Sequence, residues 1–388
     1  MNKKLFKSIF IIAIIFIFIF AFSSSYSSLN LDKLIYVLAI GIDKTSNNQL
    51  EVTFQFSNPL SPDSGGSEKA ETIINTVTAS SLSNAINLAN SYQGRQLNLS
   101  HCKIIIFSEE IASTGISDEI YTLINDTQIR PSSNIIISKC SAKYYIEQTK
   151  PEVENLISKY YETFADSSRY TGQMPDATIG KFFNNLICQS CESYAILGNA
   201  SNDNSAVQGS NNIENIGVAV FKDDILVGEL NATETIAFLN MKNKVDRFLI
   251  SVPDPLNYNN YIDIYVTPLK STKIKVDTSS PTPYIKVNCY FMARIYSMSE
   301  NSKYLSNDVL TKISNSCNSY LESVILDYLY KTSKNFKSDI NGFGTYATKN
   351  FLTTQDFEAY NWKENYKNAF FKVKVDTSVK SGMLITET

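Results

Sequence analysis

The sequence predicts a multi-domain protein of the mixed α/β (α+β) class, in which mixed sheets are flanked by helices. Its 388 residues exceed the roughly 100–200 residues of one ordinary domain. Apolar, strand-like runs alternate with segments of helical periodicity along most of the chain. Hydrophobic residues make up 43% and charged residues 19% of the total, a composition that excludes both wholesale disorder and a polytopic membrane protein.

Residues 1–28 are predicted to be a signal sequence or an N-terminal membrane anchor. Three lysines precede an apolar run, Ile9–Phe22, that carries no polar side chain, the order of charged and apolar regions in an export signal. A helix of this length rises about 21 Å, short of a hydrocarbon core of about 30 Å. Cleavage after Ser25 and retention as an anchor therefore both remain open, and we favour the anchor. Either outcome places the rest of the chain outside the cytoplasm.

The N-terminal region, residues 29–198, is predicted to contain two subdomains. A polar turn separates two β-rich runs, Leu34–Ile42 and Glu51–Phe56, and this pattern predicts a hairpin. Strands and helices alternate after the hairpin, which favours a mixed sheet. The expected strands are Ile73–Thr78, Lys103–Phe107 and Ile135–Ser138, and the expected helices are Ser80–Tyr92, Ile116–Ile124, Glu152–Phe164 and Ile179–Gln189.

A polar stretch, residues 199–214, is predicted to be the linker or loop before a C-terminal domain, residues 215–388. A tight turn between Ile216–Phe221 and Ile225–Glu229 predicts a second hairpin. Thr233 is the expected N-cap of the helix that follows. The further expected strands are Phe248–Val252, Tyr261–Lys275, Tyr284–Tyr296 and Ala369–Val375, and the expected helices are Glu234–Lys242, Asp308–Tyr330 and Phe357–Tyr366.

Few residues have the pattern that catalysis, a metal or a cofactor requires. The single histidine, His101, is accompanied by no GxSxG nucleophile elbow and no pattern of catalytic partner residues. Its place before an apolar strand favours a hydrogen-bonding role at the strand end. Metal motifs are absent, and the glycines near residue 342 do not complete a phosphate loop. No cofactor is expected. The net charge of −3 also excludes a general nucleic-acid partner, which would be basic.

The six cysteines offer the one sharper chemical hypothesis. Cys188 and Cys191 form a CxxC motif, which in a redox enzyme places a reactive thiolate at a helix N-terminus. Here the motif ends a predicted helix, and a local disulfide or two idle thiols is the simpler interpretation. Cys102 and Cys140 border two strands and would face each other if those strands pair.

Several blocks resemble one family, the C subunits of spore germinant receptors (GerAC). They occur in the family's order across nearly all of the chain after residue 29. The blocks are Leu31–Asp43 (LDKLIYVLAIGID), Glu51–Pro59 (EVTFQFSNP), His101–Glu110 (HCKIIIFSEE), Asn125–Pro131 (NDTQIRP), Ser141–Lys143 (SAK), Gly217–Gly228 (GVAVFKDDILVG) and Ser338–Gly344 (SDINGFG) with Trp362.

The resemblance implies a non-enzymatic, extracytoplasmic subunit that works with two integral-membrane receptor subunits at the outer face of the inner spore membrane and triggers germination. It implies structural or interface roles for the residues in the matching motifs. Gly41, Gly217 and Gly344 are expected at positions where a side chain would clash or φ must be positive, and Trp362 is expected to anchor packing. The motif residues are Gly41, Asp43, His101, Arg130, Gly217, Gly228, Asp339, Gly342, Gly344 and Trp362.

The N-terminus departs from the family pattern. Members of the family typically carry a lipid on a cysteine that follows the apolar run, whereas Ser23–Ser28 occupies that place here and the first cysteine is Cys102. No lipidation is therefore expected. Two other functions stay open as alternatives: an exported thiol-disulfide oxidoreductase that uses Cys188 and Cys191, and a membrane-tethered solute-binding protein. The identity of the germinant, and whether this chain contacts it, are not set by the sequence.

Overall fold

The computed structural model describes residues 7, 10–16, 33–57, 72–151, 154, 156–200, 212–257, 259–297 and 306–380. Most of the predicted signal or anchor and most of the predicted linker lie outside these residues. Within them, no helix combines the length and the apolar character needed to span a bilayer.

The first sheet contains nine strands within the described ranges, and it confirms the predicted mixed α+β class. Its order is β3-β2-β1-β5-β6-β7-β8-β9, with β4 paired to β1 beside this path. β1, β5, β6 and β7 run parallel, and the predicted hairpins form as β1–β2 and β8–β9. The strands are β1 (Leu34–Lys44), β2 (Leu50–Ser57), β3 (Thr72–Ala79), β4 (Gln96–Asn98), β5 (Ile104–Ser108), β6 (Asn134–Ser138), β7 (Tyr194–Ala200), β8 (Ile213–Lys222) and β9 (Ile225–Leu230).

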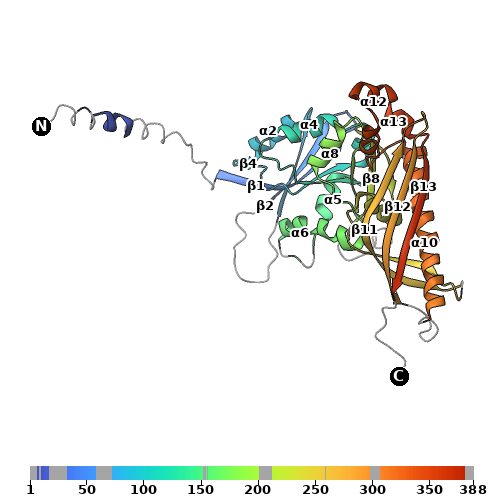
Figure 1. Ribbon diagram of the computed structural model, residues 1–388. Coiled ribbons are helices and arrows are strands. Elements are labelled where there is room, and N and C mark those ends of the chain that lie inside the picture. Colours follow the sequence, from blue (N-terminus) through green and yellow to red (C-terminus); the bar gives the residue numbers. More distant parts are fainter. Residues whose placement is uncertain are drawn as a thin grey trace.

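Helices cover both faces of this sheet. Figure 1 shows α2, α4 and α8 on one side and α5 and α6 on the other, so the parallel strands in the middle are buried and read as continuous apolar runs. α6 begins at Ile157, and Glu152, the predicted start of this helix, lies outside the described residues. The helices are α2 (Leu82–Gln93), α3 (Glu109–Ala112), α4 (Ser117–Asn125), α5 (Ala142–Gln148), α6 (Ile157–Thr163), α7 (Ser168–Thr171) and α8 (Ile179–Leu186), with a 3₁₀ turn over Phe164–Ser167.

The second sheet has the order β10-β11-β12-β13. Its strands are β10 (Phe248–Pro253), β11 (Tyr261–Asp277), β12 (Tyr284–Ser297) and β13 (Phe370–Lys380). The long helix α10 (Asn307–Tyr330) lies along one face of this sheet (Figure 1). α10 confirms the helix expected over Asp308–Tyr330. Its apolar stripe faces the core, because Val309, Ile313, Cys317 and Leu321 are all buried there.

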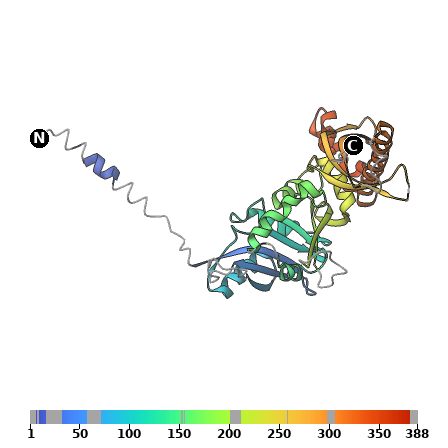
Figure 2. The ribbon, with the colours of Figure 1, turned by 90° about the horizontal axis from the view of Figure 1, so that it is seen from below.

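The two halves share strand β8. Along this strand Ala219 and Phe221 belong to the first hydrophobic core, whereas Val218 and Val220 belong to the second, as expected when successive side chains point to opposite faces. α9 (Ala232–Lys242) contacts both β8 and β11. The chain therefore forms two adjacent lobes (Figure 2), and the first sheet continues past residue 214, where the sequence places the domain boundary. That boundary stays a prediction.

Two local predictions about helix ends are wrong. Asn231, not Thr233, caps α9: its side chain accepts a hydrogen bond from Glu234 N, and the Glu234 side chain accepts one from Asn231 N, forming a capping box. The predicted helix Phe357–Tyr366 is broken at Asn361, whose φ of 52° is left-handed. It becomes α12 (Thr354–Tyr360) and α13 (Trp362–Tyr366); the other short segments are a π-helical turn over Lys331–Phe336, α11 (Gly344–Ala347) and a 3₁₀ turn over Thr348–Asn350.

Candidate functional site: the junction around Asp339

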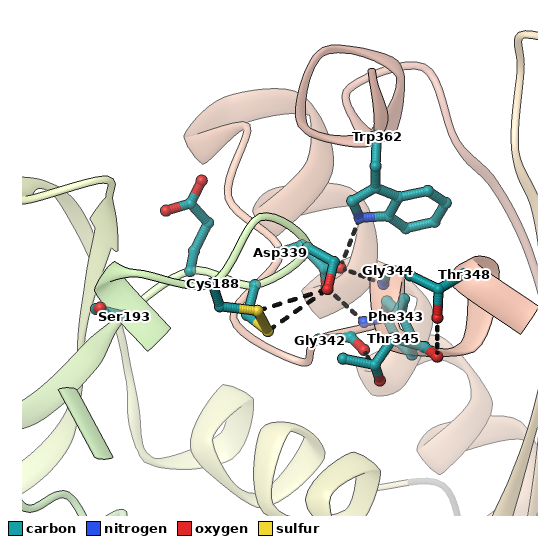
Figure 3. Close-up of a disulfide and its surroundings, with 12 residues drawn as sticks. Cys188, Ser193, Asp339, Gly342, Phe343, Gly344, Thr345, Thr348 and Trp362 are labelled. Carbon is teal, nitrogen blue, oxygen red and sulfur yellow. Dashed lines mark hydrogen bonds between the residues drawn. A yellow bond between two sulfur atoms is a disulfide. The ribbon is translucent and has the colours of Figure 1, made fainter. Parts of the chain in front are cut away.

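A buried carboxylate, Asp339, connects three segments at the junction of the two halves. Its Oδ1 accepts a hydrogen bond from Phe343 N (3.0 Å), and its Oδ2 accepts bonds from Gly344 N (2.8 Å) and Trp362 Nε1 (2.9 Å), as Figure 3 shows. Its backbone oxygen accepts a bond from Glu192 N of the N-terminal region (3.2 Å). Both side-chain oxygens are thus engaged by N–H donors, which suits a structural joint.

The turn that carries Asp339 requires its glycines. Gly342 has a φ of +72°, a left-handed conformation that glycine adopts at little cost. A Cβ on Gly344 would lie 2.5 Å from the backbone oxygen of Ser190 and 2.7 Å from Trp362 Cδ1. Gly344 therefore allows the turn to approach the N-terminal region closely. Trp362 is buried beside it, with 2% of its surface exposed.

The N-terminal region contributes the segment that directly follows α8. Cys188 and Cys191 form a disulfide in this segment, consistent with the simpler of the two sequence interpretations. Because the pair follows the end of α8, it does not sit at the helix N-terminus that would activate a redox thiolate. Gly342 lies close to this disulfide, since a Cβ added to this glycine would be 4.0 Å from Cys191 Sγ.

A second buried carboxylate, Glu192, extends the junction. Its Oε2 accepts a hydrogen bond from Asp223 N (2.7 Å) in the β8–β9 turn. Lys363 of α13 lies between two acids, with its Nζ 3.1 Å from Glu192 Oε1 and 2.8 Å from Asp223 Oδ1. The ion-pair cluster Glu192–Asp223–Lys363 therefore joins α13 to the first sheet.

Burial dominates the electrostatics of these groups. Removal from water raises the pKa of Asp339, an effect that its three N–H donors and the charge of Lys242 oppose. Burial likewise raises the pKa of Glu192, against the effect of Lys363. Although burial alone would lower it, the pKa of Lys363 is raised because Asp223 and Glu192 both stabilise its charge. Burial lowers the pKa of Lys242 to about 8.

An open groove of about 400 Å³ lies beside the disulfide, between the end of α8 and the α12–α13 turn. Its lining includes Ile187, Cys188, Phe357 and Trp362. Within the described residues, no three histidine, cysteine or carboxylate side chains gather in a way that could hold a metal ion.

Gly41 and Asp43 lie together on a different contact, between β1 and α5. A Cβ on Gly41 would be 2.8 Å from Ile146 Cδ1. The Asp43 carboxylate accepts hydrogen bonds from Ala142 N (2.7 Å) and Lys143 N (3.0 Å) at the start of α5, where the helix dipole favours a negative charge. Two of the matching motifs, one at Asp43 and one at residues 141–143, therefore touch each other.

The other motif residues lie apart from the junction. Gly217, with a φ of +106°, faces the backbone oxygen of Leu230, and Gly228 faces the ring of Phe336, so a Cβ at either position would collide. His101 packs on Tyr36 with ring centroids 4.5 Å apart. Its pKa is lowered by burial and by the charges of Arg130 and Lys103.

The structure thus brings together Asp339, Gly342, Gly344 and Trp362 and leaves the remaining motif residues elsewhere. Sequence reasoning missed Glu192 and Lys363; Glu192 directly follows the CxxC motif, and its partners come from distant segments. The expectation that Cys102 and Cys140 face each other is wrong. Their strands β5 and β6 do pair, but in parallel, so Cys102 before β5 and Cys140 after β6 lie at opposite ends of the pair, and both are free thiols.

Two family models match the chain. The spore germination protein N-terminal domain matches residues 27–195, and the spore germination B3/GerAC-like C-terminal domain matches residues 216–382. Similar curated proteins include the putative spore germination protein YfkR of Bacillus subtilis, 18% identical with 92% of each chain covered. Spore germination protein GerQC of Bacillus cereus is 20% identical, covering 90% of this chain and 92% of its own.

Spore germination protein KC of Bacillus subtilis is 21% identical, with 90% of each chain covered. Among solved structures, the crystal structure of the GerBC protein matches with a TM-score of 0.55 at 16% identity, covering 88% of this chain and 96% of that one. The likeness to GerBC shows a shared fold, and the two family models span both halves in order. The chain therefore belongs to the GerAC family of spore germination proteins.

Proposed function

We propose that the chain is the extracytoplasmic, non-enzymatic subunit of a nutrient germinant receptor. It works with two membrane-embedded partner subunits at the outer face of the inner spore membrane, and the receptor triggers germination. The observation that carries this proposal is the match of both GerAC-family models, in order, to a chain that begins with a predicted export signal.

The junction supports a scaffold role. Each buried carboxylate at this junction is bound by N–H donors or by a lysine, an arrangement that fixes geometry instead of presenting a reactive group. The place of the Cys188–Cys191 pair after the end of α8, away from a helix N-terminus, weighs against the oxidoreductase alternative. No described contact favours a solute-binding protein specifically.

Germination of spores that lack this chain tests the proposal. We expect deletion to slow or abolish the loss of refractility in response to one class of nutrient, and the wild-type gene to restore it. The chain should also copurify from spore membranes with two integral-membrane proteins. A deletion strain with an unimpaired response to all nutrients would contradict the receptor role.

Asp339→Ala and Asp327→Ala, the latter at an exposed position of α10, form a matched pair for complementation. We expect the first to fail to restore germination because the junction is lost, and the second to restore it. Enzymatic turnover of a thiol substrate by the purified chain would instead support the oxidoreductase alternative.

A further inference from the structure

Among the described residues, the side chains on one face of the second sheet are largely exposed, and this open face is strongly basic. α10 covers the other face, where Ile285, Val287 and Phe291 are buried. Strands β11, β12 and β13 together carry eight lysine or arginine residues and three aspartates. We call the open side the basic face, defined by six exposed lysines: Lys270, Lys273, Lys275, Lys286, Lys372 and Lys374.

The strand register places like charges side by side. Lys275 pairs with Lys286, and Lys286 pairs with Lys372, so three lysines form one row across three strands. The next row contains Lys273 and Lys374 on either side of Asn288. These five lysines therefore lie within a patch of about 10 Å by 7 Å at the level of the backbone.

This arrangement works against the stability of the sheet. Like charges directly opposite each other on neighbouring strands destabilise the pair. None of the six lysines has a carboxylate within ion-pair distance among the described residues; the nearest acids of the register, Asp277 and Asp376, border the two lysine rows. A cluster with this cost, in a chain whose net charge is −3, indicates an anionic partner outside the chain.

Tyrosine side chains accompany the lysines. Lys270 and Lys273 lie 5.5 Å and 5.9 Å from the ring centroid of Tyr290, and Lys286 lies 5.1 Å from that of Tyr284. Phe370, next to Tyr284 in the register, is 58% exposed. Cations interleaved with interfacial aromatic rings are typical of surfaces that meet lipid headgroups.

We propose that the basic face docks on a membrane surface by binding anionic phospholipid headgroups. The basic face is a sheet surface on which lysines stand in rows. Such a surface is better suited to bind many anionic headgroups side by side than to bind one ligand in a pocket. Seven of the eight cationic residues on β11, β12 and β13 are lysines, whereas surfaces that bind nucleic acid usually use arginine together with lysine. The predicted export also removes the chain from nucleic acid.

This inference rests on the part of the proposed function that places the chain at a membrane. Attraction to an anionic membrane surface falls off within a Debye length and weakens with salt. The basic face would therefore orient the folded chain on the bilayer independently of its predicted N-terminal anchor.

Flotation of the full-length chain with vesicles tests the inference. We compare phosphatidylcholine vesicles with vesicles that also contain phosphatidylglycerol, so that the apolar N-terminal segment contributes to both. We expect the partition coefficient to be at least about tenfold higher on the anionic vesicles at low salt, and the difference to vanish at about 1 M salt.

Charge-reversal variants identify the face responsible. Lys275→Glu/Lys286→Glu/Lys372→Glu should lose the charge-dependent increment. The matched control, Lys150→Glu/Lys244→Glu/Lys312→Glu, changes three exposed lysines elsewhere and should retain most of it. Single Lys286→Glu, which puts a carboxylate between two lysines, should melt no lower than the wild-type chain and still weaken binding, so that a loss of binding is not attributed to unfolding.

Three results would overturn the inference: equal binding to neutral and anionic vesicles, an equal loss in the control variant, or displacement from anionic vesicles by a single-stranded oligonucleotide with the same lysine dependence. The assay contains neither a partner subunit nor a nutrient. Its failure would leave the receptor assignment standing, and a failed germination assay would leave the vesicle result standing.

Discussion

At the scale of single residues, Asp339 joins segments that lie far apart in the sequence. Its carboxylate accepts hydrogen bonds from Phe343 N, Gly344 N and Trp362 Nε1 in a place that water does not reach. Such a group is costly to bury but costlier to remove, because its donors then lose their acceptor.

Asp339→Ala is expected to lower the free energy of unfolding by about 3 kcal/mol, since three buried N–H groups are left without a partner. Urea denaturation followed by the fluorescence of Trp362 measures the change. Asp376→Asn, at an exposed position on β13, is the control and should shift stability by less than about 0.5 kcal/mol. Equal stability of the two variants would contradict the role given to Asp339.

The raised pKa of Asp339 predicts a pH dependence of stability. Between the usual aspartate value and the raised one, the folded chain holds a proton that the unfolded chain has released, so the contribution of Asp339 falls as pH rises. Asp339→Asn should remove this slope. The difference in unfolding free energy between wild type and Asp339→Asn, measured at a series of pH values, isolates the effect from other carboxylates; a difference independent of pH would refute it.

The sequence pointed to part of this junction. The motif SDINGFG and Trp362 drew attention to Asp339, Gly342 and Gly344, but only through their resemblance to a family. Nothing local marked Glu192 or Lys363, because each acquires its role from partners that only the tertiary fold supplies. Asp223 had the appearance of an ordinary turn residue, and its contact with Lys363 is equally nonlocal.

At the scale of elements, α9 shows which of two neighbouring candidate residues becomes the N-cap of a helix. Thr233 and Asn231 both have side chains suited to an N-cap. The structure uses Asn231, because Glu234 then falls three residues later and completes a reciprocal capping box.

Asn231→Ala should therefore cost about 1 kcal/mol of stability, whereas Thr233→Ala, at an exposed position, should be nearly neutral. Paired thermal melts of the two variants provide the measurement. If Thr233→Ala proves the more damaging, the assignment of the cap is wrong.

Most strands and helices could be predicted, because hydrophobic periodicity is a local property. The strand β12 and the helix α10 were both expected from the sequence pattern alone, close to their observed bounds. Strand order could not be predicted, since pairing such as β12 with β13 joins segments separated by the whole of α10. The break at Asn361 was also missed, because an asparagine tolerates both helical and left-handed backbone.

At the scale of the whole molecule, β8 belongs to both hydrophobic cores. Val218 and Val220 pack in one, and Ala219 and Phe221 pack in the other. Because neither core is complete without this strand, the two lobes are expected to unfold together.

Chemical denaturation should therefore show a single transition, with coincident midpoints for two probes. The fluorescence of Trp362 reports on the second core, and exchange protection of β1 and β5 amides reports on the first. Gly217→Ala, which strains β8 itself, should shift both midpoints together. Two separated midpoints would show that the lobes are independent.

The sharing of β8 by both lobes also has a mechanical consequence. The lobes cannot rotate relative to each other about β8 without exposing one core or the other. A displacement imposed on one lobe should therefore move both lobes together as one rigid body. If the receptor relays a signal through this subunit, we expect the moving parts to lie at its contacts with neighbouring proteins and lipid, while its own interior stays unchanged.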